Sequence, residues 1–279
     1  MKGKSIFLVA ITLLFIGILA FLVYPFAMMV VSSFQNNTQD AFTFSNYAEV
    51  LTKPMYLTAF MNSILISVIS SLSALLLTII ATYAIKAKSE KFQNNILVMA
   101  NLTSNFAGIP LAFAFIILLG NTGLFTLLDR QLGLHVLEGF NLYSWSGLIL
   151  IYIYFQLPLG IMLLYPVFDG LEDNWREAAT ILGASDFQYW RRIALPFISP
   201  GILGVFAIMF ANAMGAYASA YALTGSTYNM LAIRIGATVS GDIFARPEIA
   251  ASLSVILALI LLINMLVNDW MTRRLRRDL

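Results

Sequence analysis

The sequence contains no cysteine and one histidine, and only 11% of its 279 residues are charged. Without cysteine, the chain forms neither a disulfide nor a thiolate metal site. His135 stands in a polar stretch without a cluster of other metal ligands, so we expect a surface side chain there and no metal site. The triplet Gly3, Lys4 and Ser5 matches the end of a nucleotide-binding loop, but only two residues precede it. Such a loop needs a strand and an earlier glycine, so we expect no ATP site in this chain.

Hydrophobic residues make up 60% of the chain, and the charged fraction is far below that of soluble globular proteins. Six apolar stretches are each about long enough to cross a ~30 Å hydrocarbon core as a helix. They lie near residues 6–32, 57–85, 95–119, 143–168, 198–222 and 249–270. The stretches between them are polar or broken by Gly and Pro, and none is long enough for a soluble domain. The sequence therefore predicts an all-α integral membrane protein with six transmembrane helices in one membrane domain.

None of the six apolar stretches carries an ionisable residue in its central part, and Asp269 lies at the end of the last one. Ion-coupled transporters and proton pumps usually hold an ionisable group within the membrane, because coupling needs a site that titrates or binds an ion. This pattern disfavours an ion-coupled secondary transporter, which remains the alternative from another functional class.

The distribution of Lys and Arg predicts the orientation. With the N-terminus in the cytoplasm, twelve of the 16 basic residues fall on the inner side and four, Lys53, Arg130, Arg234 and Arg246, on the outer side. Positive charge accumulates on the cytoplasmic side of membrane proteins, so we expect both termini in the cytoplasm. The basic tail is interpreted as an anchor beside anionic lipid headgroups, with no nucleic-acid role.

A spaced motif lies in the polar segment 169–197, between the fourth and fifth apolar stretches. Glu177, Ala178 and Ala179 are followed after three residues by Gly183, and nine further residues lead to the sequence Ile-Ala-Leu-Pro, which ends with Leu195 and Pro196. This spacing resembles the cytoplasmic coupling loop of ABC importer permeases, the inner-membrane components of binding-protein-dependent transport systems. Chance would rarely supply the whole register in the matching loop of a membrane protein.

The resemblance implies a type I ABC importer permease fold with a cytoplasmic coupling-helix loop. It implies an N-terminal transmembrane helix and first external loop over 1–56, a five-helix permease core over 57–270, and a cytoplasmic tail over 271–279. It also implies a bacterial inner-membrane location and three partners: a cytoplasmic ABC ATPase dimer, a second, related permease subunit and an extracellular solute-binding protein. ATP and Mg would then be bound by the ATPase subunits, and no cofactor by this chain.

Two further segments, residues 215–225 and 233–237, look most like the spermidine/putrescine branch of this superfamily. That branch also contains permeases for ferric iron and for phosphonates. The resemblance therefore implies transport of a small solute, with a polyamine-like molecule preferred and ferric iron or a phosphonate as alternatives.

The motif segment itself predicts two short helices with a sharp bend. Asn174 is expected to cap the first helix, Gly183 to take the left-handed conformation at its end, and Ser185 with Gln188 to cap the second. Pro196 is expected to limit the second helix. An amphipathic loop on the membrane surface is the alternative to an ATPase contact. The residues assigned to ATPase coupling are Glu177, Ala178, Ala179, Gly183, Phe187, Leu195 and Pro196.

Polar side chains within the third to fifth apolar stretches are costly against lipid. We assign them to the lining of a translocation path, and the alternative for each is hydrogen bonding between helices without solute contact. Because no acidic residue is available there, we expect the binding protein to select the solute. The assigned residues are Asn101, Asn105, Tyr154, Gln156, Asn212, Tyr217 and Tyr221.

Overall fold

The computed structural model describes residues 2–35, 41–240 and 245–277, and these are helical apart from turns, loops and one isolated β-bridge between Gln35 and Phe42. The all-α prediction is confirmed. The helices are α1 (Lys2–Ile18), α2 (Tyr24–Ser33), α3 (Ser45–Thr52), α4 (Pro54–Lys86), α5 (Glu90–Ser104), α6 (Ile109–Leu119), α7 (Leu124–Leu132), α8 (Trp145–Asp169), α9 (Asp173–Ile181), α10 (Asp186–Tyr189), α11 (Leu195–Met214), α12 (Tyr217–Thr224), α13 (Leu231–Ser240) and α14 (Pro247–Arg277), with π-helical turns η1 (Leu19–Val23) and η2 (Trp190–Ala194).

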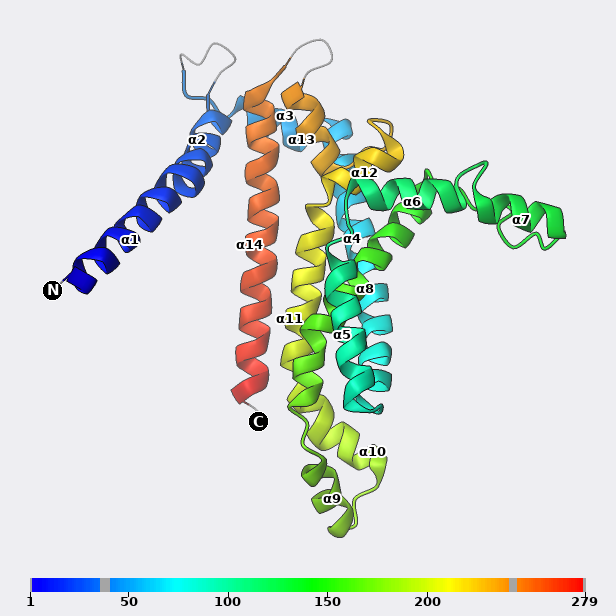
Figure 1. Ribbon diagram of the computed structural model, residues 1–279. Coiled ribbons are helices and arrows are strands. Elements are labelled where there is room, and N and C mark those ends of the chain that lie inside the picture. Colours follow the sequence, from blue (N-terminus) through cyan, green and yellow to red (C-terminus); the bar gives the residue numbers. More distant parts are fainter. Residues whose placement is uncertain (1, 36–40, 241–244, 278–279) are drawn as a thin grey trace.

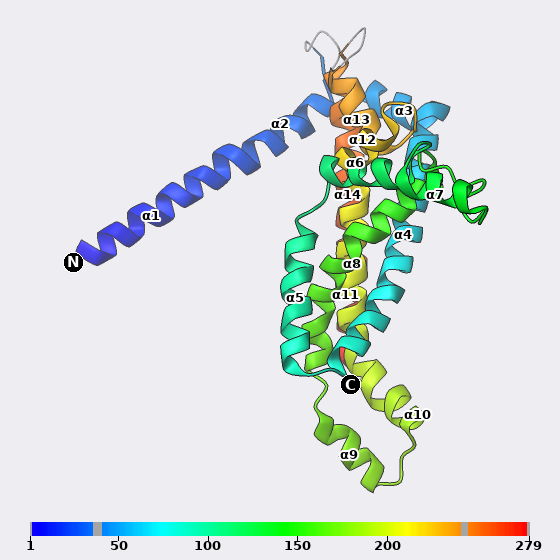
Figure 2. The same ribbon diagram turned by 45° about the vertical axis from the view of Figure 1, so that its right-hand side comes forward.

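Six helical stretches in the described residues are long and apolar enough to cross a membrane. Their bounds are Ala10–Ser33, Pro54–Lys86, Ile109–Leu132, Trp145–Asp169, Asp186–Met214 and Pro247–Leu275. The long helices α4, α8, α11 and α14 run side by side as a bundle (Figures 1 and 2). The predicted class of a six-span helical membrane protein is therefore confirmed, although two of the predicted helices differ from the observed ones.

The helix predicted over 95–119 is broken. Helix α5 ends at Ser104, and α6 begins at Ile109 after Gly108, whose φ is +76°. Glycine takes this backbone conformation at little cost, and Pro110 in the first turn of α6 needs no hydrogen-bonded N–H there. Helix α5 packs along α8, whereas α6 and α7 lie across the bundle direction in both views (Figures 1 and 2). The stretch Ile109–Leu132 is apolar and long enough to span a membrane, but it consists of two helices that lie across the bundle, whereas α5 runs along α8.

The helix predicted over 198–222 begins earlier and ends earlier. A continuous helical rod runs from Asp186 to Met214 through α10, η2 and α11. The chain then turns at Gly215 and Ala216 before α12. The expectation that Pro196 limits the preceding helix is wrong, because Pro196 lies in the first turn of α11 and the wide π-helical turn before it carries the rod onward.

The first spanning segment diverges from the bundle. Helix α2 packs against α14, and α1 extends away from the other helices (Figures 1 and 2). None of the most apolar window of Ala10–Ser33 is buried. The first helix therefore leaves an open apolar surface on the bundle.

Small and hydroxyl side chains form the centre of the bundle. Helix α4 turns a fully buried row of Ser, Ala and Thr residues toward its neighbours, and α8 is the helix it contacts most closely. At Gly160 of α8, an added Cβ would lie 2.7 Å from the hydroxyl of Thr78 and 2.1 Å from the terminal carbon of Met209 on α11. Small residues allow this close approach of three helices, as is common in membrane proteins.

Candidate functional site

The motif segment forms a helical hairpin, α9 followed by α10 and η2, which projects beyond one end of the bundle (Figure 1). Its interior is a small apolar cluster in which Ala179 packs with Tyr189 and Ala194, and the indoles of Trp175 and Trp190 lie against it. This cluster makes the hairpin a packed unit, although it lies outside the bundle.

The bend of the hairpin has the predicted geometry. Gly183 has φ +79°, its N–H bonds to the carbonyl of Thr180, and the N–H of Ala184 bonds to the carbonyl of Ala179. This is a Schellman motif, which satisfies carbonyl groups at the end of α9 and requires a left-handed residue. No atom lies within 4 Å of an added Cβ at Gly183, so backbone conformation, and not space, requires glycine.

The two helix starts differ from each other. Ser185 and Gln188 form the predicted capping box, with Gln188 N–H donating to Ser185 Oγ at 3.3 Å and Ser185 N–H donating to Gln188 Oε1 at 2.9 Å. The prediction that Asn174 caps α9 is wrong, because the helix begins at Asp173 and Glu172, two residues before Asn174, holds the cap position without a side-chain bond. The ion pair between Arg176 and Asp186, at 2.9 Å, joins the two helices, but its exposure makes its contribution small.

The outer face of the hairpin is exposed and partly apolar. Ile181 and Leu182 are 85% and 86% exposed, and Phe187 is 70% exposed. Glu177 and Ala178 are exposed beside them, whereas Ala179 faces the interior. The apolar side chains of the hairpin are therefore of two kinds: some pack inside the hairpin and others form an outward surface.

Aromatic contacts fix the hairpin to the bundle. Trp175 packs edge-on against Phe197 of α11 with 5.0 Å between ring centroids, and Trp190 packs edge-on against Tyr83 of α4 at 5.5 Å. Of the remaining predicted coupling residues, Leu195 and Pro196 lie in the first turn of α11, and Leu195 is half exposed. The rod from Asp186 to Met214 thus joins this hairpin directly to the middle of the bundle.

A polar cavity of about 860 Å³ opens at the broken helices. Asn105 and Gly108 border it from the α5–α6 break, and Asn212 and Tyr217 from the α11–α12 break. Its other lining residues are Ser104, Ala107, Phe155, Leu159, Ile208, Gly215, Ala216, Ala218 and Ser219. Discontinuous helices are expected only where their irregular backbone lines a cavity or is buried in protein. The two breaks are held together, because the N–H of Gly108 donates to Ser219 Oγ at 3.1 Å.

The predicted path residues divide in the structure. Asn105, Asn212 and Tyr217 line the cavity, and the ring of Tyr221 stacks on that of Tyr217 at 5.4 Å. Gln156 does not line it: the side chain is fully buried and hydrogen bonds to Ser71 at 3.0 Å. Its second partner is Ser70, at 3.4 Å.

Asn101 and Tyr154 also lie outside the cavity lining. The backbone carbonyl of Asn101 accepts the side-chain amide of Asn105 at 2.9 Å, and Tyr154 packs edge-on against Phe115. Residues that the sequence did not single out include Gly108 and Ser219. The sequence signals for the two helix breaks are Gly108, two residues before Pro110, and the pair Gly215-Ala216. Because the broken helices line the cavity, these signals mark it better than polarity does.

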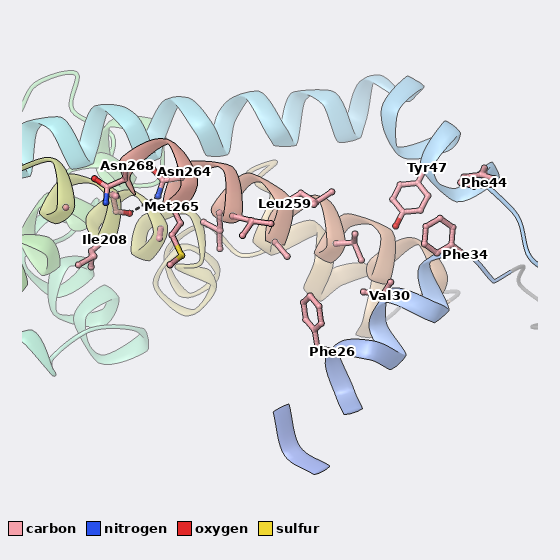
Figure 3. A pocket seen from close by; sticks show the side chains of 17 residues that line it. Phe26, Val30, Phe34, Phe44, Tyr47, Ile208, Leu259, Asn264, Met265 and Asn268 are labelled. Carbon is pink, nitrogen blue, oxygen red and sulfur yellow. Dashed lines mark hydrogen bonds between the residues drawn. The ribbon is translucent and has the colours of Figure 1, made fainter. Parts of the chain in front are cut away.

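A second, apolar groove of about 1130 Å³ lies where α1 leaves the bundle. Figure 3 shows Phe26 and Val30 of α2 on one side of it and Leu259 of α14 on the other, with Phe34 and Tyr47 at one end. Asn264 lies at the opposite end and donates to the carbonyl of Ala207 at 3.0 Å. Because its lining is almost wholly apolar, this groove suits a helix or lipid chains better than a polar solute.

Charged residues clamp the end of the bundle opposite the hairpin. Arg246 bonds to Glu49 of α3 at 2.6 and 3.0 Å and to the buried Glu248 at 3.1 Å. The hydrogen bond from Arg246 lowers the pKa of Glu49 below its usual value, against the opposing effect of burial, and Lys53 lowers it further. The clamp ties α3 to the start of α14, and the side-chain amide of Asn46 binds the end of α2 through the carbonyl of Ser33.

Known proteins resemble this chain over most of its length. A model of the family described as binding-protein-dependent transport system inner membrane component matches residues 63–277. The spermidine/putrescine transport system permease protein PotC of Escherichia coli (strain K12) is 26% identical over 254 residues, covering 88% of this chain and 89% of that protein. The trehalose transport system permease protein SugB of Mycobacterium tuberculosis is 30% identical over 184 residues, covering 66% of this chain and 61% of that protein.

Among solved structures, a bacterial alginate ABC transporter in complex with an alginate pentasaccharide-bound periplasmic protein contains a chain with the same fold. The TM-score is 0.76 at 18% identity, and the match covers 98% of this chain and 96% of that chain. At this identity the likeness concerns the fold. It extends to the first helix, which the family match does not include.

Proposed function

The chain belongs to the family of binding-protein-dependent transport system inner membrane components, and from this membership we propose that it passes a small solute under the control of a cytoplasmic ATPase. It is a multi-pass inner membrane protein and the permease subunit of an ABC importer, and it carries no ATPase site of its own. The single observation that carries the proposal is the rod Asp186–Met214, which begins in the hairpin and ends with Asn212 at the polar cavity.

The ATPase dimer would bind the outer face of the hairpin. Ile181, Leu182 and Phe187 give it apolar contact area, and Glu177 adds a polar anchor. Because the inner face of α9 is already packed against α10 and η2, the hairpin presents this surface without rearranging. Movement of the hairpin would then be transmitted to the cavity through α11. Since η2 and α11 are continuous, ATP-driven closure would tilt the wall that bears Asn212.

The polar cavity would form this subunit's half of the translocation path. Its polar groups are neutral amides and hydroxyls, set among apolar side chains such as Phe155 and Leu159, which suits brief contact with a polar solute better than tight selection. Selection of the solute would therefore belong to an extracellular binding protein. The alginate transporter, which was solved with a periplasmic protein bound to it, is the structural precedent for that arrangement.

A second, related permease would occupy the apolar groove with one of its helices and pack against α1. A helix about 10 Å across fits a groove of this volume, and the apolar lining matches a membrane-buried helix surface. The unburied length of Ala10–Ser33 supports the same interpretation, because this helix extends over space that the chain itself does not fill. The partner is proposed to be a different, related subunit.

The two ends of the bundle would face opposite sides of the membrane. The end of α14 and the hairpin α9–α10 lie toward the same end of the molecule in Figure 1. Placing that end in the cytoplasm agrees with the excess of Lys and Arg there and puts both termini inside. The outer clamp of Glu49, Arg246 and Glu248 would then brace the surface that meets the binding protein.

A polyamine-like solute is the preferred cargo, on the likeness to PotC over 88% of the chain. Ferric iron or a phosphonate remains the alternative, and an ion-coupled mechanism is disfavoured by the uncharged centres of the spans. The experiment is uptake of labelled spermidine, ferric iron and a phosphonate by vesicles that hold the subunit with its ATPase, its second permease and its binding protein.

Uptake should require ATP, and Leu182→Asp should abolish it by placing a charge in the ATPase contact, whereas the conservative Leu182→Met should not. Uptake driven by an ion gradient without ATP would overturn the proposal. Uptake of ferric iron or a phosphonate in place of spermidine would correct only the solute.

A further inference from the structure

Helices α6 and α7 form an arm that leaves the bundle at the end opposite the hairpin. In both views the arm extends to the side opposite α1, across the direction of the long helices (Figures 1 and 2). Four residues from Gly120 to Gly123 join the two helices. The arm therefore projects from the bundle on the side away from the apolar groove.

Helix α7 is amphipathic, and its apolar side has no cover within the described chain. Its five large apolar residues are each between 41% and 65% exposed. With 100° per residue, they fall within one broad sector of the helix surface, whereas Thr126, Asp129 and Arg130 fall on the other side. The apolar residues are Leu124, Phe125, Leu127, Leu128 and Leu132.

The arm is an ordered unit, so the exposed apolar side is a defined surface. The carboxylate of Asp129 accepts the N–H groups of Val136 and Leu137 at 3.0 and 3.1 Å, which folds the returning chain against α7. Gly133, with φ +64°, ends the helix, and the N–H of Leu134 bonds to the carbonyl of Asp129. The returning chain adds exposed apolar side chains at Leu134 and Val136.

The position of the arm indicates which partner covers it. It lies beside α12, toward the end of the bundle away from the hairpin, where the boundary of a bilayer is expected (Figure 1). Trp145, which begins α8 close to the returning chain, is 56% exposed, and Trp and Tyr are enriched at membrane–water interfaces. An apolar patch of this kind is unfavourable in water, whereas an amphipathic helix at the headgroup boundary buries its apolar face in acyl chains.

We propose that α7 lies flat in the lipid leaflet opposite the coupling hairpin, with Leu128 in the acyl region and Arg130 toward the headgroups. The arm then holds α6, which packs against α12 and is tied to it by the bond from Gly108 to Ser219. Because α12 carries Tyr217 and Tyr221, the bilayer surface fixes the rim of the polar cavity. The occupant is a lipid surface, and neither the identity of the solute nor the ATPase contact enters this inference.

The absence of native cysteine allows a direct test. Leu128→Cys and the matched control Arg130→Cys, two residues apart and about 200° apart around the helix, each receive a nitroxide label. The labelled protein is placed in nanodiscs of phosphatidylethanolamine and phosphatidylglycerol. The spin relaxation of the nitroxide by oxygen, which concentrates in lipid, is compared with its relaxation by a water-soluble nickel chelate. Both side chains reach the surface, Leu128 with 41% exposure, so a label can be attached at either position.

The label at Leu128 should be relaxed by oxygen and protected from nickel, with an oxygen-to-nickel ratio severalfold above that at Arg130. Two outcomes would overturn the inference. Equal access of nickel to both positions would place the arm in water. Protection of Leu128 from both reagents would mean that a protein surface covers it, either a second copy or another subunit.

Discussion

The N–H of Leu195 bonds to the carbonyl of Trp190, five residues back, in place of the usual four. This wide turn accommodates the sequence just before Pro196, which has no N–H to give to a helix. As a result, the second half of the hairpin, α10 and η2, continues into α11 as one rod without a flexible joint. In the proposed mechanism, a movement of the hairpin would therefore reach the cavity wall through the backbone hydrogen bonds of this rod.

If the rod transmits movement, a variant that loosens it should separate ATPase binding at the hairpin from solute uptake through the cavity. Leu195→Gly combined with Arg192→Gly should loosen the rod, because both side chains are exposed and each glycine weakens a helix by about 1 kcal/mol relative to alanine. We expect the ATPase still to co-purify, since the outer face of the hairpin is unchanged, while uptake falls. The matched control, Leu195→Ala combined with Arg192→Ala, keeps strong helix formers at both positions and should retain uptake. Full uptake by the double glycine variant would show that rigidity at this turn is not used.

A second prediction separates the cavity from helix packing. Single cysteines at Asn105 and Asn212 should react with a small water-soluble thiol reagent, because both side chains line the open cavity. A cysteine at Gln156 should remain unreactive, because that side chain is buried against Ser70 and Ser71. If Gln156 labels as fast as Asn212, the path runs between α4 and α8.

Much of the hairpin could be predicted from the sequence because its signals are local. Gly183 requires one backbone conformation, and Ser185 with Gln188 satisfies two N–H groups within four residues. The prediction that Pro196 ends the second helix is wrong, because a proline that would end an α-helix is tolerated after a π-helical turn. Nothing in the residues before it distinguishes these two outcomes.

The cavity and the groove depend on contacts between distant parts of the chain. The stretches 95–119 and 198–222 are each apolar enough on average to be predicted as one helix, so hydropathy does not reveal that each breaks and that the two broken regions meet through Gly108 and Ser219. A glutamine in a spanning helix avoids lipid whether its partner is a solute or another side chain, so the sequence alone does not identify the partner. The packing of α8 on α4 places Gln156 against Ser71, to which it is hydrogen bonded. The groove follows from the direction of α1, which no local pattern encodes.

Two glycines provide a matched test of the bundle centre. Gly160→Ala should destabilise the subunit by about 1–3 kcal/mol, because the new methyl group would overlap Thr78 and Met209. Gly204→Ala in α11 has no atom within 4 Å of the new carbon and should be neutral or stabilise by about 0.5–1 kcal/mol. Thermal unfolding in detergent measures both. Equal effects would mean that the α4–α8–α11 approach is looser than described.

The outer clamp predicts a pH dependence. The folded-state pKa of Glu49 is lowered from 4.5 chiefly by Arg246, so ionised Glu49 stabilises the fold above that value and the contribution is lost as pH falls through the folded pKa. Glu49→Gln should therefore unfold more easily than the wild type near neutral pH, and the difference should shrink in acid below pH ~4. A difference that stays constant with pH would show that the Glu49–Arg246 pair contributes no net stability.

The hairpin is proposed to be the ATPase contact, and Gly183 tests this role most directly. Gly183→Val should cost about 1 kcal/mol or more of backbone strain and turn α9, with Glu177, away from its direction. Gly139→Val is the matched control, since Gly139 also has a positive φ, of 85°, and no atom within 4 Å of an added Cβ.

The measurement is the amount of ATPase that co-purifies with the membrane-inserted subunit, together with solute uptake in vesicles. Gly183→Val and Glu177→Arg should lose both, Gly139→Val should keep both, and the binding protein should bind its solute normally throughout. Full ATPase association and uptake in Gly183→Val and Glu177→Arg would contradict the assignment of this hairpin as the coupling element.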